Sequence, residues 1–255
     1  MEKVAVIIPA AGQGLRFGGD LPKQFVPVMG KPLLAWTLHA VISAAPVSSC
    51  IVVLPRDNFQ HYKKILESSL TELLTSLTIQ KGDERRVCFQ NEQVSFITVP
   101  GGSERQESVW EGLKVIPDGI EWVAVHDGAR PLVSKEVFLR VFEKARLVGA
   151  AIAAIPARDT VKRVKNYSYD YIINETLDRS TLWLAQTPQI FRRDIIIRAY
   201  EEAFSTNFVG TDDASLVERL KNPVAIVEGD PLNIKITSKE DMEWLTWHLQ
   251  RKNAK

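Results

Sequence analysis

The loop that follows the first apolar run of the chain is rich in glycine and carries two cations. After the run at 4–8 the sequence reads PAAGQGLRFGGDLPKQF, which contains Gly12, Gly14, Arg16 and Lys23. Backbone N–H groups freed by glycine can wrap a phosphate chain, and an arginine can bind two of its oxygens at once. The spacing is neither that of a P-loop nor that of the dinucleotide-binding fingerprint, because the first three glycines read GxGxxxG. The loop therefore predicts contact with an anion, and the alternative is a flexible loop whose charges are solvated.

Two more motifs place polar residues directly after apolar runs. VHDGARP follows the run at 122–125, and its Asp127 could hold a hard divalent cation through oxygen. GGSERQESV follows the run at 96–99, and the helix that it opens could accept a base carbonyl or a phosphate at its N-terminus. The alternatives are an Asp-Gly turn and a helix that Ser103 merely caps. His126 is predicted to pack in the core rather than to bind a ligand.

Two motifs in the last quarter of the chain also bear on a site. TDDASLVE predicts a helix N-terminus with Thr211 as the cap and with Asp212 and Asp213 favouring the helix dipole. NIKIT is predicted to form the last strand, and Lys235 within it implies that its ammonium group meets an anion at the strand end.

The chemistry that these motifs favour is phosphoryl or nucleotidyl transfer. The sequence has no Ser-His-Asp arrangement, no HExxH motif and no carboxylate pair suited to acid–base work. Glycines, arginines, lysines and one aspartate suit a reaction in which catalysis consists of positioning and charge stabilisation. An attacking phosphate is already an anion, so such a reaction requires no general base.

The composition indicates an ordinary globular protein. The chain has 255 residues, of which 45% are hydrophobic and 25% charged, and its net charge is +1. This balance argues against a nucleic-acid-coating protein or a polybasic membrane binder. The two cysteines are far apart and form no CxxC motif, and no stretch approaches a membrane span. We therefore expect a soluble, cytoplasmic protein without a signal peptide.

The elements that must position these motifs follow from an alternation of apolar runs with helical patterns. Continuous apolar strands between amphipathic helices predict a doubly wound, mostly parallel α/β sheet that is covered on both faces, and ligands bind outside the carboxyl ends of such strands. The glycine-rich loop, GGSERQESV and VHDGARP all fall at that edge. The predicted strands are 4–8, 51–54, 96–99, 122–125, 151–155, 224–227 and 233–236. The predicted helices are 32–45, 58–70, 104–115, 135–148 and 194–204, with two more beginning near Thr211 and at Ser238.

The segment 158–187 breaks this alternation. Its apolar and polar residues alternate over short stretches rich in Val, Tyr and Ile, with a polar turn near 166–170. This pattern predicts a β-hairpin arm that extends from a single domain of residues 1–255. An isolated two-stranded hairpin is only marginally stable in water, so we expect the arm to pack on a second copy of the chain in a homodimer.

Taken together and in this order, the motifs resemble those of the 2-C-methyl-D-erythritol 4-phosphate cytidylyltransferase family. The matching motifs are PAAGxGxRxG with PKQ, GGxxRxxSV, VHDGARP, PxRDTxK, LxxxQTPQxF, TDDxxxxE and NIKIT, and they run from residue 4 to about residue 249. The resemblance implies a Rossmann-like nucleotidyltransferase fold, CTP as co-substrate, Mg²⁺ or another divalent cation, and a homodimer. It implies a role in non-mevalonate isoprenoid synthesis, with small-molecule substrates and neither nucleic acid nor membrane as a partner.

The resemblance also implies roles for individual residues. Arg16 and Lys23 would stabilise the charged transition state at the α-phosphate, and Asp127 would lie beside the metal ion. Nucleotide-binding roles fall on Ala10, Ala11, Gly12, Gly14, Gly102, Ser108 and Ala129. Roles toward the acceptor fall on Asp127, Arg130, Thr160, Arg179, Thr187, Thr211 and Lys235, with Thr160 and Arg179 reaching the partner's site.

Two alternatives stay open at the level of sequence. A ribitol 5-phosphate cytidylyltransferase resembles this family in nearly every motif, because both acceptors are polyol phosphates. A catalytically silent nucleotide-binding protein on the same fold is the other alternative, and the presence of Arg16, Lys23 and Asp127 argues against it. The segment 69–93 is polar and weakly patterned and is predicted to be a surface excursion without an assigned role.

Overall fold

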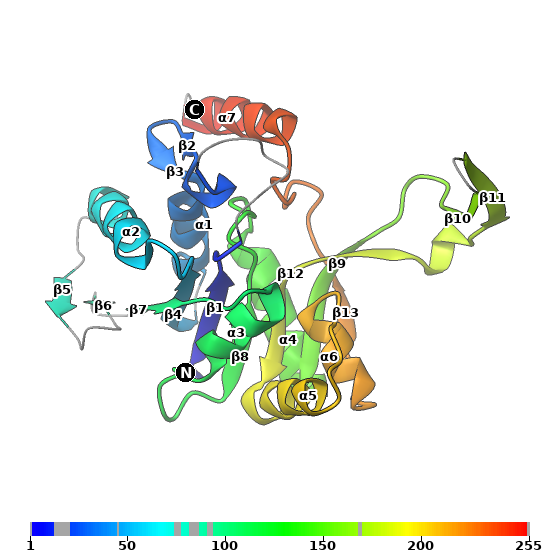
Figure 1. Ribbon diagram of the computed structural model, residues 1–255, viewed down its shortest axis with the longest axis horizontal. Coiled ribbons are helices and arrows are strands. Elements are labelled where there is room, and N and C mark those ends of the chain that lie inside the picture. The colour runs from blue at the N-terminus through cyan, green and yellow to red at the C-terminus, as the bar shows by residue number, and fades with distance from the viewer. Residues whose placement is uncertain are drawn as a thin grey trace.

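A nine-stranded sheet forms the centre of the protein (Figure 1). The computed structural model describes residues 2–12, 21–44, 46–73, 78–81, 87–90, 94–167 and 170–253. In spatial order the strands are β13 (Ala225–Glu228), β9 (Ala150–Pro156), β12 (Trp183–Arg192), β8 (Trp122–Val125), β1 (Val4–Pro9), β4 (Val47–Leu54), β7 (Ser95–Pro100), β6 (Val87–Gln90) and β5 (Thr78–Lys81). The neighbours β8, β1, β4 and β7 run parallel, as do β13 and β9, whereas β12, β5 and β6 pair antiparallel.

Helices cover both faces of the sheet, because the strands are apolar on both sides. In β1, Val4, Val6 and Ile8 join one hydrophobic cluster, and Ala5 and Ile7 join the other. The first cluster is covered by α1 (Leu33–Ile42), α2 (Phe59–Leu73) and α4 (Lys135–Val148), and the second by α3 (Arg105–Leu113), α5 (Arg193–Ser205) and α6 (Asp213–Arg219). A third cluster lies between α7 (Lys239–Asn253), the start of α1 and the short hairpin of β2 (Pro27–Val28) and β3 (Lys31–Pro32).

The doubly wound sheet predicted from the sequence is confirmed, and the predicted helices overlap the observed ones. Two N-caps differ from the prediction, since Glu104 rather than Ser103 caps α3 and Asp212 rather than Thr211 caps α6. A capping box stands at the start of α7: Ser238 N donates to Asp241 Oδ2 at 2.9 Å, and Asp241 N donates to Ser238 Oγ at 3.2 Å.

Strand β12 was not predicted. It pairs antiparallel with β8 and β9, and its first residues, Trp183 to Thr187, are the last part of the predicted arm 158–187. The ladder with β9 shifts register between Ala185 and Gln189, and Pro188 lies in that interruption. A proline is tolerated in a sheet where the hydrogen-bond ladder is interrupted. Because of this proline and the polar residues before it, the hydrophobic pattern of the sequence does not predict the strand.

The segment 233–236 is not a strand, which corrects the predicted last strand of the sheet. Hydrogen bonds to other segments hold it instead; among them, Asn233 Nδ2 donates to Thr187 O at 2.8 Å, and Ile236 N donates to Ala129 O at 2.8 Å. These bonds lay the segment against the loop that follows β8, and Lys235 therefore lies beside that loop.

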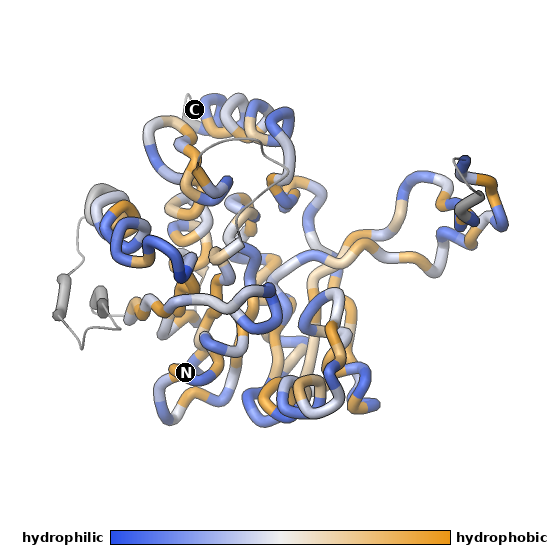
Figure 2. The backbone as a smooth tube through the Cα atoms, in the orientation of Figure 1, coloured by the Kyte–Doolittle hydropathy of each residue, from blue (hydrophilic) through white to orange (hydrophobic). Residues whose placement is uncertain are grey.

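The arm is a hairpin of β10 (Lys162–Tyr167) and β11 (Asp170–Thr176) that pairs with no other strand among the described residues. Figure 1 shows it extending away from the body of the protein. Its large apolar side chains Val164, Tyr171, Ile172 and Ile173 are exposed, and Figure 2 shows apolar segments along it. The predicted hairpin is thus observed, and its apolar surface is left uncovered within this chain.

In the part of the chain that the structure describes, no helix is long and apolar enough to cross a membrane. Within the polar segment 69–93, the helix α2 ends at Leu73, and β5 and β6 extend the edge of the sheet.

Candidate active site

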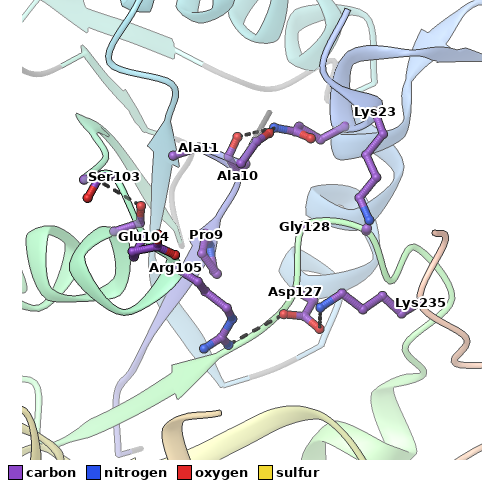
Figure 3. A pocket seen from close by; sticks show the side chains of 15 residues that line it. Pro9, Ala10, Ala11, Lys23, Ser103, Glu104, Arg105, Asp127, Gly128 and Lys235 are labelled. Carbon is purple, nitrogen blue, oxygen red and sulfur yellow. Dashed lines mark hydrogen bonds and ion pairs between the residues drawn. The ribbon is translucent and has the colours of Figure 1, made fainter. Parts of the chain in front are cut away.

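Three loops at the carboxyl edge of the sheet form one pocket of about 310 Å³ (Figure 3). They follow β1, β7 and β8, as the positions of the three motifs predict, and the segment around Lys235 closes the remaining side. The lining residues are Pro9, Ala10, Ala11, Gly12, Lys23, Gln24, Gly102, Ser103, Glu104, Arg105, Ser108, Asp127, Gly128, Ala129 and Lys235.

Backbone hydrogen bonds to neighbouring strands fix the first residues of these loops. Ala10 N donates to Val53 O at 2.8 Å, and Gly101 N donates to Leu54 O at 2.8 Å. A Cβ atom on Gly101 would lie 2.4 Å from Ala11 Cβ and 2.8 Å from Ser108 Oγ. Position 101 therefore has to be glycine for the loop after β7 to approach the loop after β1.

Gln24 binds the start of the loop that follows β1. Its amide nitrogen donates to Ala10 O at 2.5 Å and to Gly12 O at 2.7 Å, and the side chain is buried. These two bonds hold the backbone of Ala10 to Gly12 beside the pocket. Gln24 belongs to the PKQ motif, but the sequence alone gave it no role.

Asp127 lies at the centre of the charged groups. Its carboxylate is 3.0 Å from Lys235 Nζ, 3.3 Å from Arg130 Nε and 3.6 Å from Arg105 Nη2. Figure 3 shows Arg105 and Lys235 approaching this carboxylate from opposite sides. Lys23 lies on another side of the pocket, where its Nζ donates to Ile236 O at 2.8 Å. The predicted anion for Lys235 is thus Asp127 itself.

These cations keep Asp127 charged. Burial would raise the pKa of its carboxyl group, but the charges of Lys235, Arg105 and Arg130 together hold that pKa well below its usual value. Among the described residues no group of three or more His, Cys, Asp or Glu side chains could hold a metal ion by itself. One ionised carboxylate does suit a divalent cation that takes its other ligands from substrate phosphates and water, which is the usual mode for Mg²⁺.

His126 is a core residue, as predicted. Its ring is fully buried, with Nε2 at 3.0 Å from Arg130 O and Nδ1 at 3.0 Å from Thr187 Oγ1. Because a carbonyl oxygen only accepts, Nε2 carries the proton, and the Thr187 hydroxyl donates to Nδ1. The same hydroxyl oxygen accepts from Asp127 N at 3.0 Å. This chain of hydrogen bonds ties the loop after β8 to β12.

Arg105 is held by a buried carboxylate on α6. Its Nη2 donates to Asp213 Oδ2 at 2.7 Å, and Tyr200 donates its hydroxyl to Asp213 Oδ1 at 2.5 Å. Asp213 and Tyr200 are fully buried. The sequence placed Arg105 near the first turn of a helix without a role, and it assigned Asp213 only to the helix dipole.

The predicted site residues fall into five groups. Arg130 and Thr187 are buried behind the pocket, Thr211 is exposed just before α6, and Thr160 and Arg179 are exposed at the base of the arm, where Arg179 Nη1 donates to Arg158 O at 2.6 Å. Gly14 and Arg16 lie outside the described residues. The predicted residues that do line the pocket are Ala10, Ala11, Gly12, Lys23, Gly102, Ser108, Asp127, Ala129 and Lys235.

Comparison with known proteins gives concordant matches. The family model described as IspD: 2-C-methyl-D-erythritol 4-phosphate cytidylyltransferase matches residues 4–251. The protein of that name from Syntrophus aciditrophicus is 41% identical over 240 residues, which cover 94% of this chain and 93% of the relative. A bifunctional enzyme IspD/IspF from Desulfotalea psychrophila is 38% identical over 242 residues, and this chain spans only 55% of that relative's length.

A solved structure agrees with the sequence matches. The crystal structure of 4-diphosphocytidyl-2C-methyl-D-erythritol synthase from Anaerococcus prevotii is similar with a TM-score of 0.76 and 31% identity, covering 98% of this chain and 96% of that one. These matches confirm the resemblance that the motifs carry.

The buried ring of His126 predicts a pH dependence of stability. Burial lowers its pKa to about 4, whereas an unfolded histidine titrates near pH ~6.5. The contribution of the neutral ring is therefore complete above about pH 6.5 and is lost progressively as the pH falls to about 4, by about 3 kcal/mol in total. The pKa of Asp127 is lowered as well, and because a carboxyl group titrates at lower pH than a histidine, its contribution is lost only at still lower pH.

Denaturant unfolding at a series of pH values measures this effect. We expect His126→Asn to flatten the dependence between pH ~6.5 and ~4, and the exposed His39, replaced in the same way, to leave it unchanged. A dependence in His126→Asn equal to that of the unmodified chain would contradict the assignment. If that variant does not fold, NMR titration of the His126 ring decides the question, since a ring that titrates near its ordinary pKa would also contradict it.

Proposed function

We propose that this chain, which belongs to the 2-C-methyl-D-erythritol 4-phosphate cytidylyltransferase family, joins CTP to 2-C-methyl-D-erythritol 4-phosphate. A phosphate oxygen of the acceptor attacks the α-phosphorus of CTP, the bond between the α- and β-phosphates breaks, and pyrophosphate leaves. The product is 4-diphosphocytidyl-2-C-methyl-D-erythritol, in non-mevalonate isoprenoid biosynthesis. The observation that carries the proposal is the pocket at the carboxyl edge of the sheet in which Arg105 and Lys235 flank Asp127 and Lys23 lines another side.

The described residues suit the nucleotide half of this reaction. The backbone of Ala10 to Gly12, held by Gln24, would bind the triphosphate together with Gly14 and Arg16. Gly102 and Ser108 would bind cytosine: Gly102 N already donates to Ser108 Oγ at 3.2 Å, and a Cβ atom on Gly102 would lie 2.3 Å from Glu107 Cβ. The tight fit at this loop favours a pyrimidine over a purine.

The charged groups suit the chemical step. As negative charge builds at the α-phosphate and on the leaving pyrophosphate, fixed cations stabilise the transition state. Lys23 would do this together with Arg16. Asp127 would hold Mg²⁺ or another divalent cation, which neutralises triphosphate charge when bound. The acceptor attacks as an anion, so none of these residues needs to remove a proton.

The acceptor half of the site would be completed by a second copy of the chain. Arg130, Thr187, Thr211, Lys235 and Asp127 would belong to one subunit, with Ala129 near the nucleotide's ribose. Thr160 and Arg179 are exposed on the arm and do not line the pocket of their own chain. The uncovered apolar side chains of the arm support a homodimer in which each arm packs against the partner.

Two alternatives remain as outcomes of a test. One is ribitol 5-phosphate as the acceptor, which is also a polyol phosphate. The chain could also bind nucleotide without turnover. A cytoplasmic location stays a prediction from the sequence.

The direct test of the proposed function is release of pyrophosphate in the presence of Mg²⁺. We expect release with CTP and 2-C-methyl-D-erythritol 4-phosphate, little with ribitol 5-phosphate, and little when ATP or GTP replaces CTP. Faster release with ribitol 5-phosphate would reassign the acceptor. Equal release with ATP would contradict the cytosine-binding role of Gly102 and Ser108, and binding of CTP without release in any mixture would support the silent alternative.

For Lys23→Ala we expect a loss of kcat of roughly a hundredfold with little change in the KM for CTP, because the ammonium group acts mainly on charge that develops in the transition state. Steady-state kinetics measures both values. The exposed Lys239, replaced by alanine, removes the same charge outside the pocket and should leave both unchanged. A near-normal kcat with a raised KM would mean that Lys23 only binds substrate.

The shared site can be tested by mixing two inactive variants, Arg16→Ala and Arg179→Ala. If each site takes Arg16 from one chain and Arg179 from the other, a mixed dimer has one site with both defects and one intact site. About half of the refolded dimers are mixed, so roughly a quarter of the full activity should return. Mixed dimers that form but recover no activity would place both residues in the site of one chain.

A further inference from the structure

Arg105 enters the pocket from the start of α3, and its shortest printed ion pair is with Asp213, a carboxylate that does not line the pocket. Among the described residues, both of its ion pairs are made by Nη2, at 2.7 Å from Asp213 and at 3.6 Å from Asp127. Burial alone would lower the pKa of this guanidinium, but the charges of Asp213 and Asp127 raise it above its ordinary value. Its side chain keeps 34% of its surface exposed, on the side of the pocket.

The partner of Arg105 is rigid. Asp213 is the first residue of α6, and Gln189 of β12 fixes that end of the helix by donating to Asp212 Oδ2 at 2.7 Å and accepting from Ala214 N at 3.0 Å. Tyr200 of α5 binds the second oxygen of Asp213. The Tyr200 ring is itself stacked on Trp110, with the ring planes 6° apart. The position of the Arg105 guanidinium is therefore set by Asp213 and by the buried residues that hold Asp213.

Asp127 would compete for the same guanidinium. At 3.6 Å its carboxylate is beyond hydrogen-bond distance of Nη2, whereas Asp213 at 2.7 Å is well within it. Without the charge of Asp213, Arg105 would close onto Asp127. That would bring the guanidinium group onto Asp127 Oδ1, the carboxylate oxygen nearest to it.

We infer that Arg105 is a further substrate-contacting residue that binds an oxygen of the nucleotide's phosphate chain, and that Asp213 and Tyr200 are positioning residues that hold it away from Asp127. The inference deepens the proposed function and rests on it. Its basis is the pocket position of Arg105 together with the buried hydrogen bonds through Asp213 to Tyr200. Since Arg105 pairs most closely with a carboxylate outside the pocket, its remaining N–H groups can bind phosphate without giving up that pair.

Equilibrium binding of CTP and of inorganic tripolyphosphate to the full chain, followed by calorimetry, tests this. Arg105→Ala should weaken both by about tenfold or more, the range expected for a hydrogen bond to a charged group. Tyr200→Phe keeps the ring stacked on Trp110 and removes only the hydroxyl, and it should weaken both by roughly threefold to tenfold. In the Arg105→Ala background, Tyr200→Phe should cause no further change, because Tyr200 acts through Arg105.

The control is Arg219→Ala. Arg219 Nε pairs with Glu202 at 2.9 Å and so also links α6 to α5, but on the surface away from the pocket. It should leave both affinities unchanged, which separates positioning of Arg105 from general loosening of the two helices. Asp213→Asn should resemble Arg105→Ala; should it fail to fold, the cycle of Arg105 and Tyr200 variants is decisive without it.

The outcomes separate the inference from the proposed function. Unchanged affinity in Arg105→Ala would overturn the substrate contact, and an equal loss from Tyr200→Phe in both backgrounds would overturn the positioning role. A chain that binds tripolyphosphate but not CTP would contradict the proposed function, while the variants would still test Arg105. A chain that binds neither would overturn both.

Discussion

The carboxylate of Asp127 is the charge on which the geometry of the pocket depends. A nearly buried carboxylate is tolerated only when it is paired and hydrogen-bonded, and its three cationic partners come from α3, from its own loop and from the segment that precedes α7. These segments are far apart in the sequence. Asp127 therefore makes close ion pairs with Lys235 and Arg130, and it also faces the charge of Arg105, which Asp213 holds at 2.7 Å.

Hydrogen bonds from neighbouring segments hold the loop that carries Asp127. Thr187 accepts from Asp127 N and donates to His126, and Arg130 donates through Nη1 to Asn233 O at 2.7 Å. The loop after β8 is thus bound to β12 on one side and to the segment 233–236 on the other. Residues expected to touch the acceptor, such as Thr187 and Arg130, have a structural function in addition, because they fix the carboxylate that faces the pocket.

The architecture of the sheet and the place of the pocket could be predicted from the sequence, since both depend on local patterns. The alternation of apolar runs with helical segments predicts the doubly wound sheet, and the position of the glycine-rich loop, GGSERQESV and VHDGARP after strands predicts that they meet at one edge. Strand β12 escaped prediction because Pro188 and its polar neighbours obscure the strand pattern. The role of Asp213 was not predicted, because the helix dipole alone explains an acidic residue at a helix start. Its contact with Arg105 joins positions that are distant in the chain. The segment 233–236 was misassigned because its apolar alternation is that of a strand, although tertiary hydrogen bonds hold it as a loop.

The insertion of β12 between β8 and β9 also governs the order in which the sheet can be completed. Strand β9 pairs only with β12 and β13 among the described residues, both of which come later in the chain. During synthesis, β1, β4, β7 and β8 can assemble as their residues emerge, while β9 presents two unpaired edges until residue 192 is available. Closure of the sheet is therefore a non-local event, of the kind that slows folding and leaves strand edges open to intermolecular pairing. The hairpin of β10 and β11 lies between β9 and β12 in sequence, and its local pairing shortens the effective loop that this closure must span.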